Sequence, residues 1–383
     1  MNQINKLYLS NFLTGLVFWY GIEKLFMTSI GINAYSLGTI TALFIVATML
    51  LDIPGGMLAD RWSRKGTLAL STLFLGLCAI VLGNSNGYGL YLAGYLLYAL
   101  YIVTTEGTYQ AIMYDSLHEL SIQKQYSKLN GRAHALFLCG AGLANIASGF
   151  IAGHFGYRVP FYVSVIPCII NFALILSIKE PKYHKPTQSE AISKQLVRAS
   201  RALVKIRLLQ VLAVVMSLLG IIEYFKSDFG QLYFLRYVSS AQLLGLIWAA
   251  YAFTWAIGSF IAHRLHRHLN LLIFASIVPV MLMAFIDSWP AIILFNIQAV
   301  ASSALFNQIE TRIQDETPSH VRASVISTLS TVGRIIAIPS TIAMGWLINT
   351  HGAFYTVRAV SIVGLVALLY WLRYSVTTKP TNK

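Results

Sequence analysis

Gly56–Lys65 reads GMLADRWSRK, a short charged segment between two long apolar ones. Gly56 has no side chain, which would let its helix approach a neighbouring helix closely. The carboxylate of Asp60 can pair with nearby cations or face the positive N-terminus of another helix. Three basic residues follow it: Arg61, Arg64 and Lys65. The stretch therefore predicts a tight, charged connection between two helices.

Composition places most of the chain in lipid. Only 11% of the 383 residues are charged and 56% are hydrophobic, whereas soluble domains carry about 25% charged residues. The cysteines Cys78, Cys139 and Cys168 each stand alone in an apolar run, so we expect neither disulfides nor a metal site. The net charge of +14 is spread over short loops, which argues against a nucleic-acid partner.

The apolar segments have the length of membrane-spanning helices. A helix needs about 20 apolar residues to cross the hydrocarbon, and lipid favours helices because they satisfy their own backbone. The first segment has no small-residue cleavage site, so we expect it to be retained. We predict an all-α membrane protein with twelve spans, at residues 7–28, 34–59, 66–83, 88–114, 132–153, 159–178, 206–228, 239–262, 269–286, 290–310, 323–348 and 353–373.

The distribution of basic residues predicts the orientation. With the N-terminus inside, nearly all Lys and Arg fall in cytoplasmic segments, and both termini are expected there. The polar stretch 179–205 separates six spans from six, so the predicted domains are bundles at 1–178 and 206–383. Within the connecting stretch, 191–207 has the pattern of a basic amphipathic helix on the inner leaflet.

The two halves repeat weakly in sequence. The connection after span 2, starting at Gly56, has a counterpart after span 8 that starts at Ser259. Glu23 follows Gly21-Ile22 in span 1, and Glu223 follows Gly220-Ile221-Ile222 in span 7. Repeated six-helix halves around a central pathway are a transporter design.

The stretch Gly56–Lys65 closely resembles the signature G-x-L-A-D-R-x-G-R-K of the major facilitator superfamily, with Ser63 in place of the usual glycine. Arg322–Ser327 is similar to a second passage of that family. The resemblance extends to its bacterial proton-coupled drug and metabolite efflux members. It implies a fold of two pseudo-symmetric six-helix bundles and a cytoplasmic gate formed by Asp60, Arg64 and Asp115, together with Gly56, Arg61 and Lys65. The alternative is that these charges only set the topology.

Three ionisable residues lie at mid-depth, where a charge costs roughly 3 kcal/mol and needs a cavity, a partner or a function. Glu106 precedes Asp115 by nine residues; in a continuous helix it would lie roughly 13 Å away on the opposite face. We interpret Glu106 as a proton-exchanging carboxylate in a cavity, with Asp52 as the second proton candidate. Arg334 is the cation that would hold a carboxylate or an anionic substrate; static pairing of Asp52 or Glu106 with Arg334 remains open. The side of span 4 that carries Glu106 also holds Tyr91, Tyr95, Tyr98, Thr105 and Tyr109.

Glu23 and Glu223 lie nearer the outer mouth, in spans that line the pathway in the resembled family. The aromatic neighbours of these two residues would suit an amphipathic or cationic substrate. For each, simple neutralisation by a nearby lysine, Lys24 or Lys226, is an equal alternative.

These observations predict a secondary active transporter that exports a small amphipathic molecule by alternating access, coupled to protons. Proton-coupled import or export of a specific metabolite, such as a sugar, organic acid or siderophore, is the alternative. The spans lack the catalytic clusters of an enzyme and the charge rings of a channel. We expect a monomer in the cell inner membrane, in contact with lipids, with no cofactor.

Overall fold

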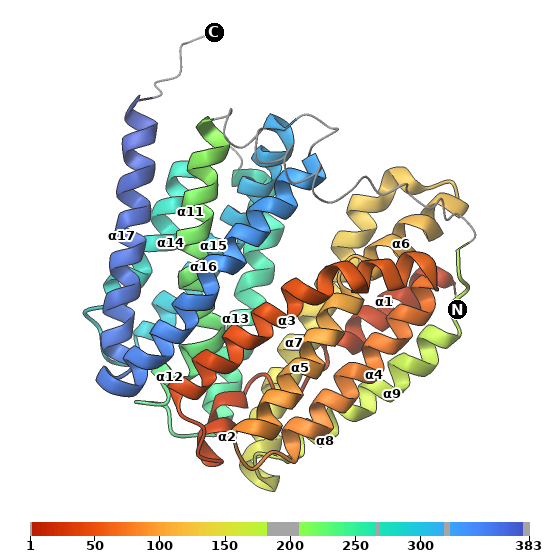
Figure 1. Cartoon of the computed structure of the whole chain (residues 1–383), viewed down its shortest axis with the longest axis horizontal. Helices are drawn as coiled ribbons and strands as arrows, with labels where there is room; N and C mark the ends of the chain where they lie inside the picture. The colour runs from red at the N-terminus through yellow and green to blue at the C-terminus, as the bar shows by residue number, and fades with distance from the viewer. Residues whose placement is uncertain (1, 182–206, 266–267, 318–321, 378–383) are drawn as a thin grey trace. The chain divides into compact units, whose positions relative to one another are not determined.

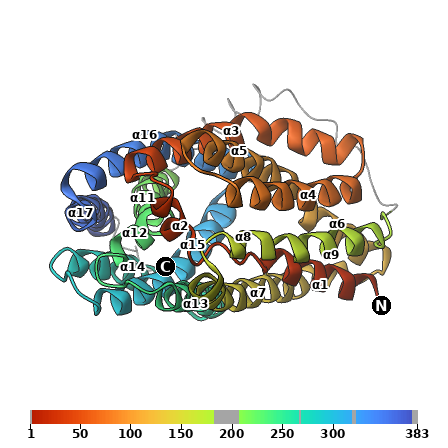
Figure 2. The same cartoon turned by 90° about the horizontal axis from the view of Figure 1, so that it is seen from below.

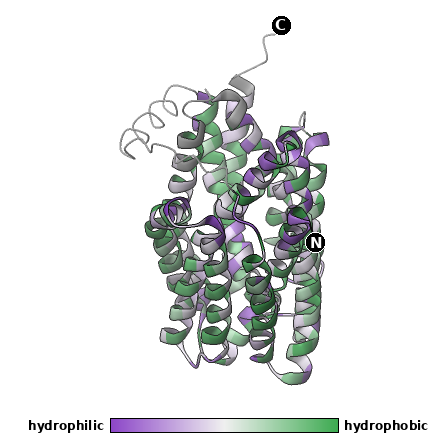
Figure 3. Cartoon of the chain, turned by 90° about the vertical axis from the view of Figure 1, so that its right-hand side faces the viewer, coloured by the Kyte–Doolittle hydropathy of each residue, from purple (hydrophilic) through white to green (hydrophobic). Residues whose placement is uncertain are grey.

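The computed structural model describes residues 2–181, 207–265, 268–317 and 322–377 (Figure 1). All regular structure in these ranges is helical. The predicted amphipathic helix at 191–207 lies outside the described residues, except that Arg207 begins α11. Hydrophobic residues, green in Figure 3, cover the helices along most of their length.

Contacts divide the chain into two compact units, Met1–Thr187 with Val238–Phe253, and Gln188–Tyr237 with Thr254–Lys383. Each unit is a bundle of helices, and its elements can be followed by colour in Figures 1 and 2. The first unit contains α1 (Gln3–Gly15), α2 (Glu23–Ser29), α3 (Ala34–Arg61), α4 (Arg64–Gly83), α5 (Tyr88–Thr105), α6 (Thr108–Glu119), η1 (Gln123–Gln125), α7 (Tyr126–Phe155), α8 (Val159–Val163) and α9 (Val165–Leu176).

The second unit contains α11 (Arg207–Tyr224), η2 (Phe225–Phe229), α12 (Gly230–Phe234), η3 (Ala262–Leu265), α14 (Leu269–Met283), α15 (Ala291–Glu316), α16 (Arg322–His351) and α17 (Ala353–Thr377). α13 (Ala241–Ile261) is divided between the units. Its first part packs on α7 because small residues bring the two backbones together: a Cβ added at Gly149 would lie 2.5 Å from the Ala241 carbonyl oxygen. The two units do not coincide with the predicted bundles 1–178 and 206–383, because Val238–Phe253 groups with the first unit.

Among the described residues, ten segments are long and apolar enough to span a membrane. Two of the twelve predicted spans do not meet that description. The first is interrupted between α1 and α2, and α14 has 15 residues, roughly 22 Å of helix against about 30 Å of hydrocarbon. The helical membrane fold is confirmed, while the count of twelve stays a prediction.

Side chains at the helix starts explain several boundaries. Asn33 accepts a hydrogen bond from Ser36 N at 2.9 Å ahead of α3, and Ser63 accepts one from Gly66 N at 2.8 Å ahead of α4. Such caps satisfy backbone N–H groups that have no partner within the helix. A buried hydrophobic cluster then fixes α6 against α1, α7 and α9; it includes Leu7, Ile112, Met113, Leu117, Ala133 and Ile175.

Candidate functional site

Span 4 is broken at Glu106 and Gly107. α5 ends at Thr105, Glu106 is extended, and Gly107 has φ +78° before α6 begins at Thr108. That backbone conformation favours glycine, because an L side chain is strained there. The span predicted at 88–114 is present within the apolar segment Tyr88–Glu119, but its helix is broken. The argument that fixed the faces of Glu106 and Asp115 by counting residues along a continuous helix is therefore wrong.

The break exposes Glu106 to a cavity of about 270 Å³ in the first unit. Tyr109, also predicted from sequence, lines the cavity, and its hydroxyl donates to the Leu7 carbonyl oxygen at 3.0 Å. The cavity thus joins a carboxylate to polar and aromatic side chains from three spans. Its full lining is Asn11, Thr14, Tyr101, Ile102, Thr105, Glu106, Tyr109, Gln110, Asn130, His134 and Phe137.

Other predicted pathway residues lie elsewhere. Asp52 is half-buried on α3, two residues before Pro54. The Tyr98 hydroxyl lies 2.7 Å from that of Tyr20, in an aromatic cluster beside the interruption of span 1. Arg334 lies in the second unit on α16, near enough to Tyr224 to act on it electrostatically. The structure therefore brings Glu106 and Tyr109 into one cavity without Asp52, Tyr98 or Arg334 in its lining.

Glu23 begins α2, directly after the interruption of span 1. Its side chain is buried beside that of Lys24, with Lys24 Nζ 3.0 Å from Glu23 Oε2. Glu23 Oε1 accepts hydrogen bonds from the hydroxyls of Tyr91, at 2.8 Å, and Tyr95. The aromatic face predicted for span 4 is thus shared: two tyrosines serve Glu23 and Tyr109 serves the Glu106 cavity. This geometry favours the alternative in which Lys24 neutralises Glu23.

Glu223 lies at the corresponding point of the second unit. It stands near the end of α11, where a π-helical turn, η2, follows. Gln298 on α15 donates from Nε2 to Glu223 Oε1 at 2.8 Å and accepts a bond from Lys226 Nζ at its Oε1. π-turns inside α-helices are frequent at functional sites.

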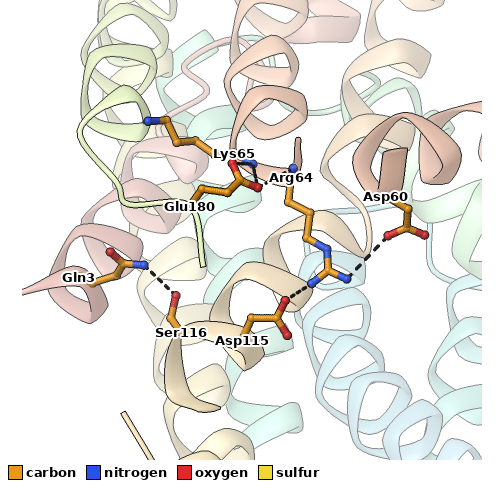
Figure 4. A network of polar contacts seen from close by, with 7 residues as sticks. All are labelled: Gln3, Asp60, Arg64, Lys65, Asp115, Ser116 and Glu180. Carbon is orange, nitrogen blue, oxygen red and sulfur yellow. Dashed lines mark hydrogen bonds and ion pairs between the residues drawn. The ribbon is translucent and has the colours of Figure 1, made fainter. Parts of the chain in front are cut away.

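The predicted gate residues form a cluster at the start of α4 (Figure 4). The Arg64 guanidinium pairs with Asp115, and its second amino group lies 3.7 Å from Asp60 Oδ1. Asp115 and Arg64 are largely buried, whereas Asp60 is 59% exposed at its side chain. Arg61 is exposed at the end of α3, and Lys65 Nζ donates to the Leu176 carbonyl oxygen at 2.9 Å.

On α3 a close helix approach occurs at Gly55, one residue before Gly56, where a close approach is predicted from the sequence. A Cβ added at Gly55 would lie 2.8 Å from the Val103 carbonyl oxygen of α5, whereas no described atom lies within 4 Å of the corresponding point at Gly56. Successive residues of a helix point in different directions, so Gly55 and Gly56 lie on different faces of α3. Packing of α3 on α5 therefore depends on Gly55.

Residues 7–338 match a protein family described as Major Facilitator Superfamily. The chain belongs to the major facilitator superfamily. It is a multi-pass membrane transporter of the secondary-transporter kind and not an enzyme, which confirms the predicted family and fold.

Solved structures of superfamily members share this fold over nearly their whole length. The nucleoside transporter NupG aligns with a TM-score of 0.78 at 15% identity, covering 97% of this chain and 99% of that one. A bacterial homologue of the human lysosomal transporter Spinster, inward-facing and unoccupied, aligns at 0.76 and 15%, covering 99% and 98%. A D-xylose–proton symporter aligns at 0.71 and 14%, covering 97% and 98%. At these identities the likeness is one of fold.

A relative by sequence is Multidrug resistance protein 2 of Bacillus subtilis (strain 168). It is 26% identical over 159 residues, which is 40% of this chain and 38% of that protein. The chain therefore matches well under half of that relative's length.

One residue beside the predicted gate residues was not identified from the sequence. Glu180, just beyond α9, accepts hydrogen bonds from Ser63 Oγ at 2.6 Å and from Arg64 N at 2.9 Å, and its carboxylate also receives Lys65 N at 3.2 Å (Figure 4). A carboxylate at a helix N-terminus is stabilised by the helix dipole. Ser63, which departs from the family glycine, thus joins α4 to the end of α9.

The polar residues that line the cavity with Glu106 were also not identified from the sequence. Asn11 and Thr14 are three apart on α1, and Asn130 and His134 are four apart on α7. Residues at these spacings share one helix face. That spacing was the signal available in the sequence of this superfamily member.

Proposed function

We propose that this chain is a proton-coupled transporter that exports a small amphipathic molecule across the cytoplasmic membrane by alternating access. The observation that carries the proposal is Glu106, an exposed carboxylate at a helix break that lines a cavity of about 270 Å³. Broken spans with their ends at a central cavity are a recurring way to build a transport site.

The chemistry of the cavity suits this role. A carboxylate can bind either a proton or a substrate cation, and the rings of Tyr101, Tyr109 and Phe137 offer apolar and cation–π contacts to the rest of an amphipathic molecule. Because a proton and a cation compete for one carboxylate, uptake of the proton favours release of the substrate. That competition is the differential binding which exchange transport needs.

The gate cluster is proposed to control access on the cytoplasmic side. In this mechanism Arg64 holds α4 to α6 through Asp115 and to the end of α3 through Asp60. Both termini and the stretch 179–205 are proposed to face the cytoplasm, with the two six-helix bundles acting as a monomer. Asp52 is the second proposed proton site, and Arg334 the proposed partner for a carboxylate or an anionic substrate.

Two observations support export. Glycines on both helices let α7 and α13 approach closely: an added Cβ would lie 2.5 Å from the Ala241 carbonyl oxygen at Gly149 of α7, and 2.5 Å from the Asn145 carbonyl oxygen at Gly245 of α13. The relative from Bacillus subtilis is named for multidrug resistance.

A specific polar metabolite is the second candidate. The amides of Asn11, Gln110 and Asn130 in the cavity lining favour it, because a few polar groups in a ligand cavity select ligands that satisfy their hydrogen bonds. Structures of similar fold include a nucleoside transporter and a D-xylose symporter.

The deciding experiment has two stages. Thermal unfolding of the purified protein is measured against drugs, sugars, organic acids and siderophores at two pH values, because a ligand stabilises the state that it binds. Flux of the stabilising compound is then measured in proteoliposomes with an imposed pH gradient. We expect Glu106→Gln to abolish the gradient-driven component while the protein still folds.

Glu119→Gln is the matched control, because Glu119 is an exposed carboxylate on α6 outside the cavity lining. It should transport as the wild type does. Unchanged coupled flux in Glu106→Gln would contradict the assignment, and stabilisation by polar metabolites alone would select the second candidate.

A further inference from the structure

The two units carry matched glutamate–lysine sets near the irregular points of spans 1 and 7. In each set a carboxylate and a buried lysine contact a facing helix, α5 in the first unit and α15 in the second. Lys24 and Lys226 are each only 1% exposed. The two sets occupy equivalent positions in the repeated halves of the sequence, but their hydrogen bonds differ.

The carboxylate of Glu23 is fully engaged. One oxygen accepts from two tyrosine hydroxyls, those of Tyr91 and Tyr95, and the other lies 3.0 Å from Lys24 Nζ. Hydrogen bonds and an adjacent cation both favour the ionised form of a carboxyl group. Glu23 is therefore anchored by three side chains, those of Tyr91, Tyr95 and Lys24.

The carboxylate of Glu223 is only half engaged. Oε1 accepts from Gln298, whereas Oε2 is shielded from solvent and has no hydrogen-bond partner in the described part of the chain. A buried acceptor without a partner costs about 1–3 kcal/mol. Protonation at Oε2 removes the charge that makes this burial unfavourable.

Gln298 stands between Glu223 and Lys226. Its Nε2 donates hydrogen bonds to Glu223 Oε1 and to Ser302 Oγ, the second at 2.7 Å, and these fix the orientation of the amide. Its Oε1 accepts a hydrogen bond from Lys226 Nζ. Lys226 is also held by the Phe295 carbonyl oxygen at 3.2 Å, with Nζ 4.3 Å from the Phe295 ring centroid. The amide thereby links the lysine to the carboxylate in place of the direct contact seen between Lys24 and Glu23.

We propose that Glu223 is a proton-binding group of the second unit and that Gln298 is its positioning residue, which keeps Lys226 from pairing with it directly. The inference rests on the proposed proton-coupled function. In the proton step an O–H bond forms at Glu223 Oε2 and the carboxylate loses its charge; no other covalent bond changes. The two glutamates of the repeat then have different tasks, anchoring in the first unit and proton exchange in the second.

Other charged groups surround this site. Asp228 on η2 and Arg334 on α16 both act electrostatically on Tyr224, the neighbour of Glu223. From α17, Gly364 meets α11 at Ile222. Lys226 is linked to Glu223 through Gln298, whereas Asp228 and Arg334 act on the neighbouring Tyr224.

Infrared difference spectroscopy tests the proposal on the whole protein in lipid. The carboxylic-acid C=O band is followed as pH is varied, and the contribution of Glu223 is the part lost in Glu223→Gln. In Lys226→Gln the midpoint should move to higher pH by about 1–3 units, because a neighbouring cation is lost. In Gln298→Leu it should move to lower pH, because direct pairing with the freed Lys226 outweighs the hydrogen bond from Gln298 Nε2 that the carboxylate loses.

Gln308→Leu is the matched control. Gln308 is a buried amide on the same helix, and its Nε2 donates to the Ala262 carbonyl oxygen at 2.5 Å. It should leave the midpoint unchanged. The proposal would be overturned if the pH midpoint of the band moved in the same direction in Lys226→Gln and Gln298→Leu. It would also be overturned if no part of the band depended on Glu223. The band is measured without transport, so a protein with a titrating Glu223 and no proton-driven flux contradicts the proposed function and leaves this inference standing.

Discussion

Replacing Gly107 with alanine tests whether the break in span 4 is what places Glu106 at the cavity. Gly107 has φ +78°, and no described atom lies within 4 Å of the position of an added Cβ. The substitution therefore acts through the backbone conformation and not through a collision. Glu106, one residue earlier, is left chemically unchanged.

The magnitude follows from two effects with the same sign. Strain at such a φ costs about 1–3 kcal/mol for a residue with a side chain, and alanine favours a continuous helix over glycine by about 1 kcal/mol. The broken form thus loses about 2–4 kcal/mol relative to a continuous helix. Since 1.4 kcal/mol corresponds to a factor of ten, its population relative to the continuous helix falls about 30- to 700-fold.

The assay is pH-driven flux in proteoliposomes together with thermal unfolding. Gly107→Ala should lose coupled flux, which is also the result expected for Glu106→Gln. Gly87→Ala is the control, because Gly87 also precedes a helix and has no described atom within 4 Å of its Cβ position, but its φ of 167° is extended. Wild-type flux and an unchanged unfolding temperature in Gly107→Ala would refute the role of the break.

Two further predictions concern the gate cluster and the start of α4. Asp115→Asn should lower the free energy of unfolding by about 1–3 kcal/mol, between the values for surface and buried ion pairs, because it leaves the largely buried Arg64 without its closest carboxylate. Asp60→Asn, at a 59% exposed side chain, should lose under about 1 kcal/mol; equal losses in chemical denaturation would count against the burial argument. Glu180→Ala should cost about 1 kcal/mol by removing the acceptor at the start of α4. Lys179→Ala, whose contacts with Gln3 use only the backbone of Lys179, should stay within about 0.5 kcal/mol, and a similar loss in both would reject the cap.

Hydropathy predicts the helical membrane fold because lipid imposes one requirement on every span. Hydropathy does not predict the break at Gly107, because it depends on residue type alone and is the same for a glycine inside a helix and for one at a break. The charges of the signature predict the Arg64–Asp115 pair through resemblance. Glu180 reaches the same turn from 116 residues away, and a single sequence holds no measure of that distance in space. Gly55 and Gly56 are likewise indistinguishable until the facing helix is known.

The paired charges at the start of α2 bear on how the protein responds to voltage. Glu23 and Lys24 are adjacent, buried and 3.0 Å apart, so together they carry no net charge. One elementary charge moved through the whole membrane potential gains or loses about 2.3 kcal/mol per 100 mV. Because the pair sums to zero, its displacement during a transport cycle moves no net charge through that field. In the proposed proton-coupled cycle the electrical driving force then acts on the cargo and on the carboxylates proposed to exchange protons, and not on this pair of span 1.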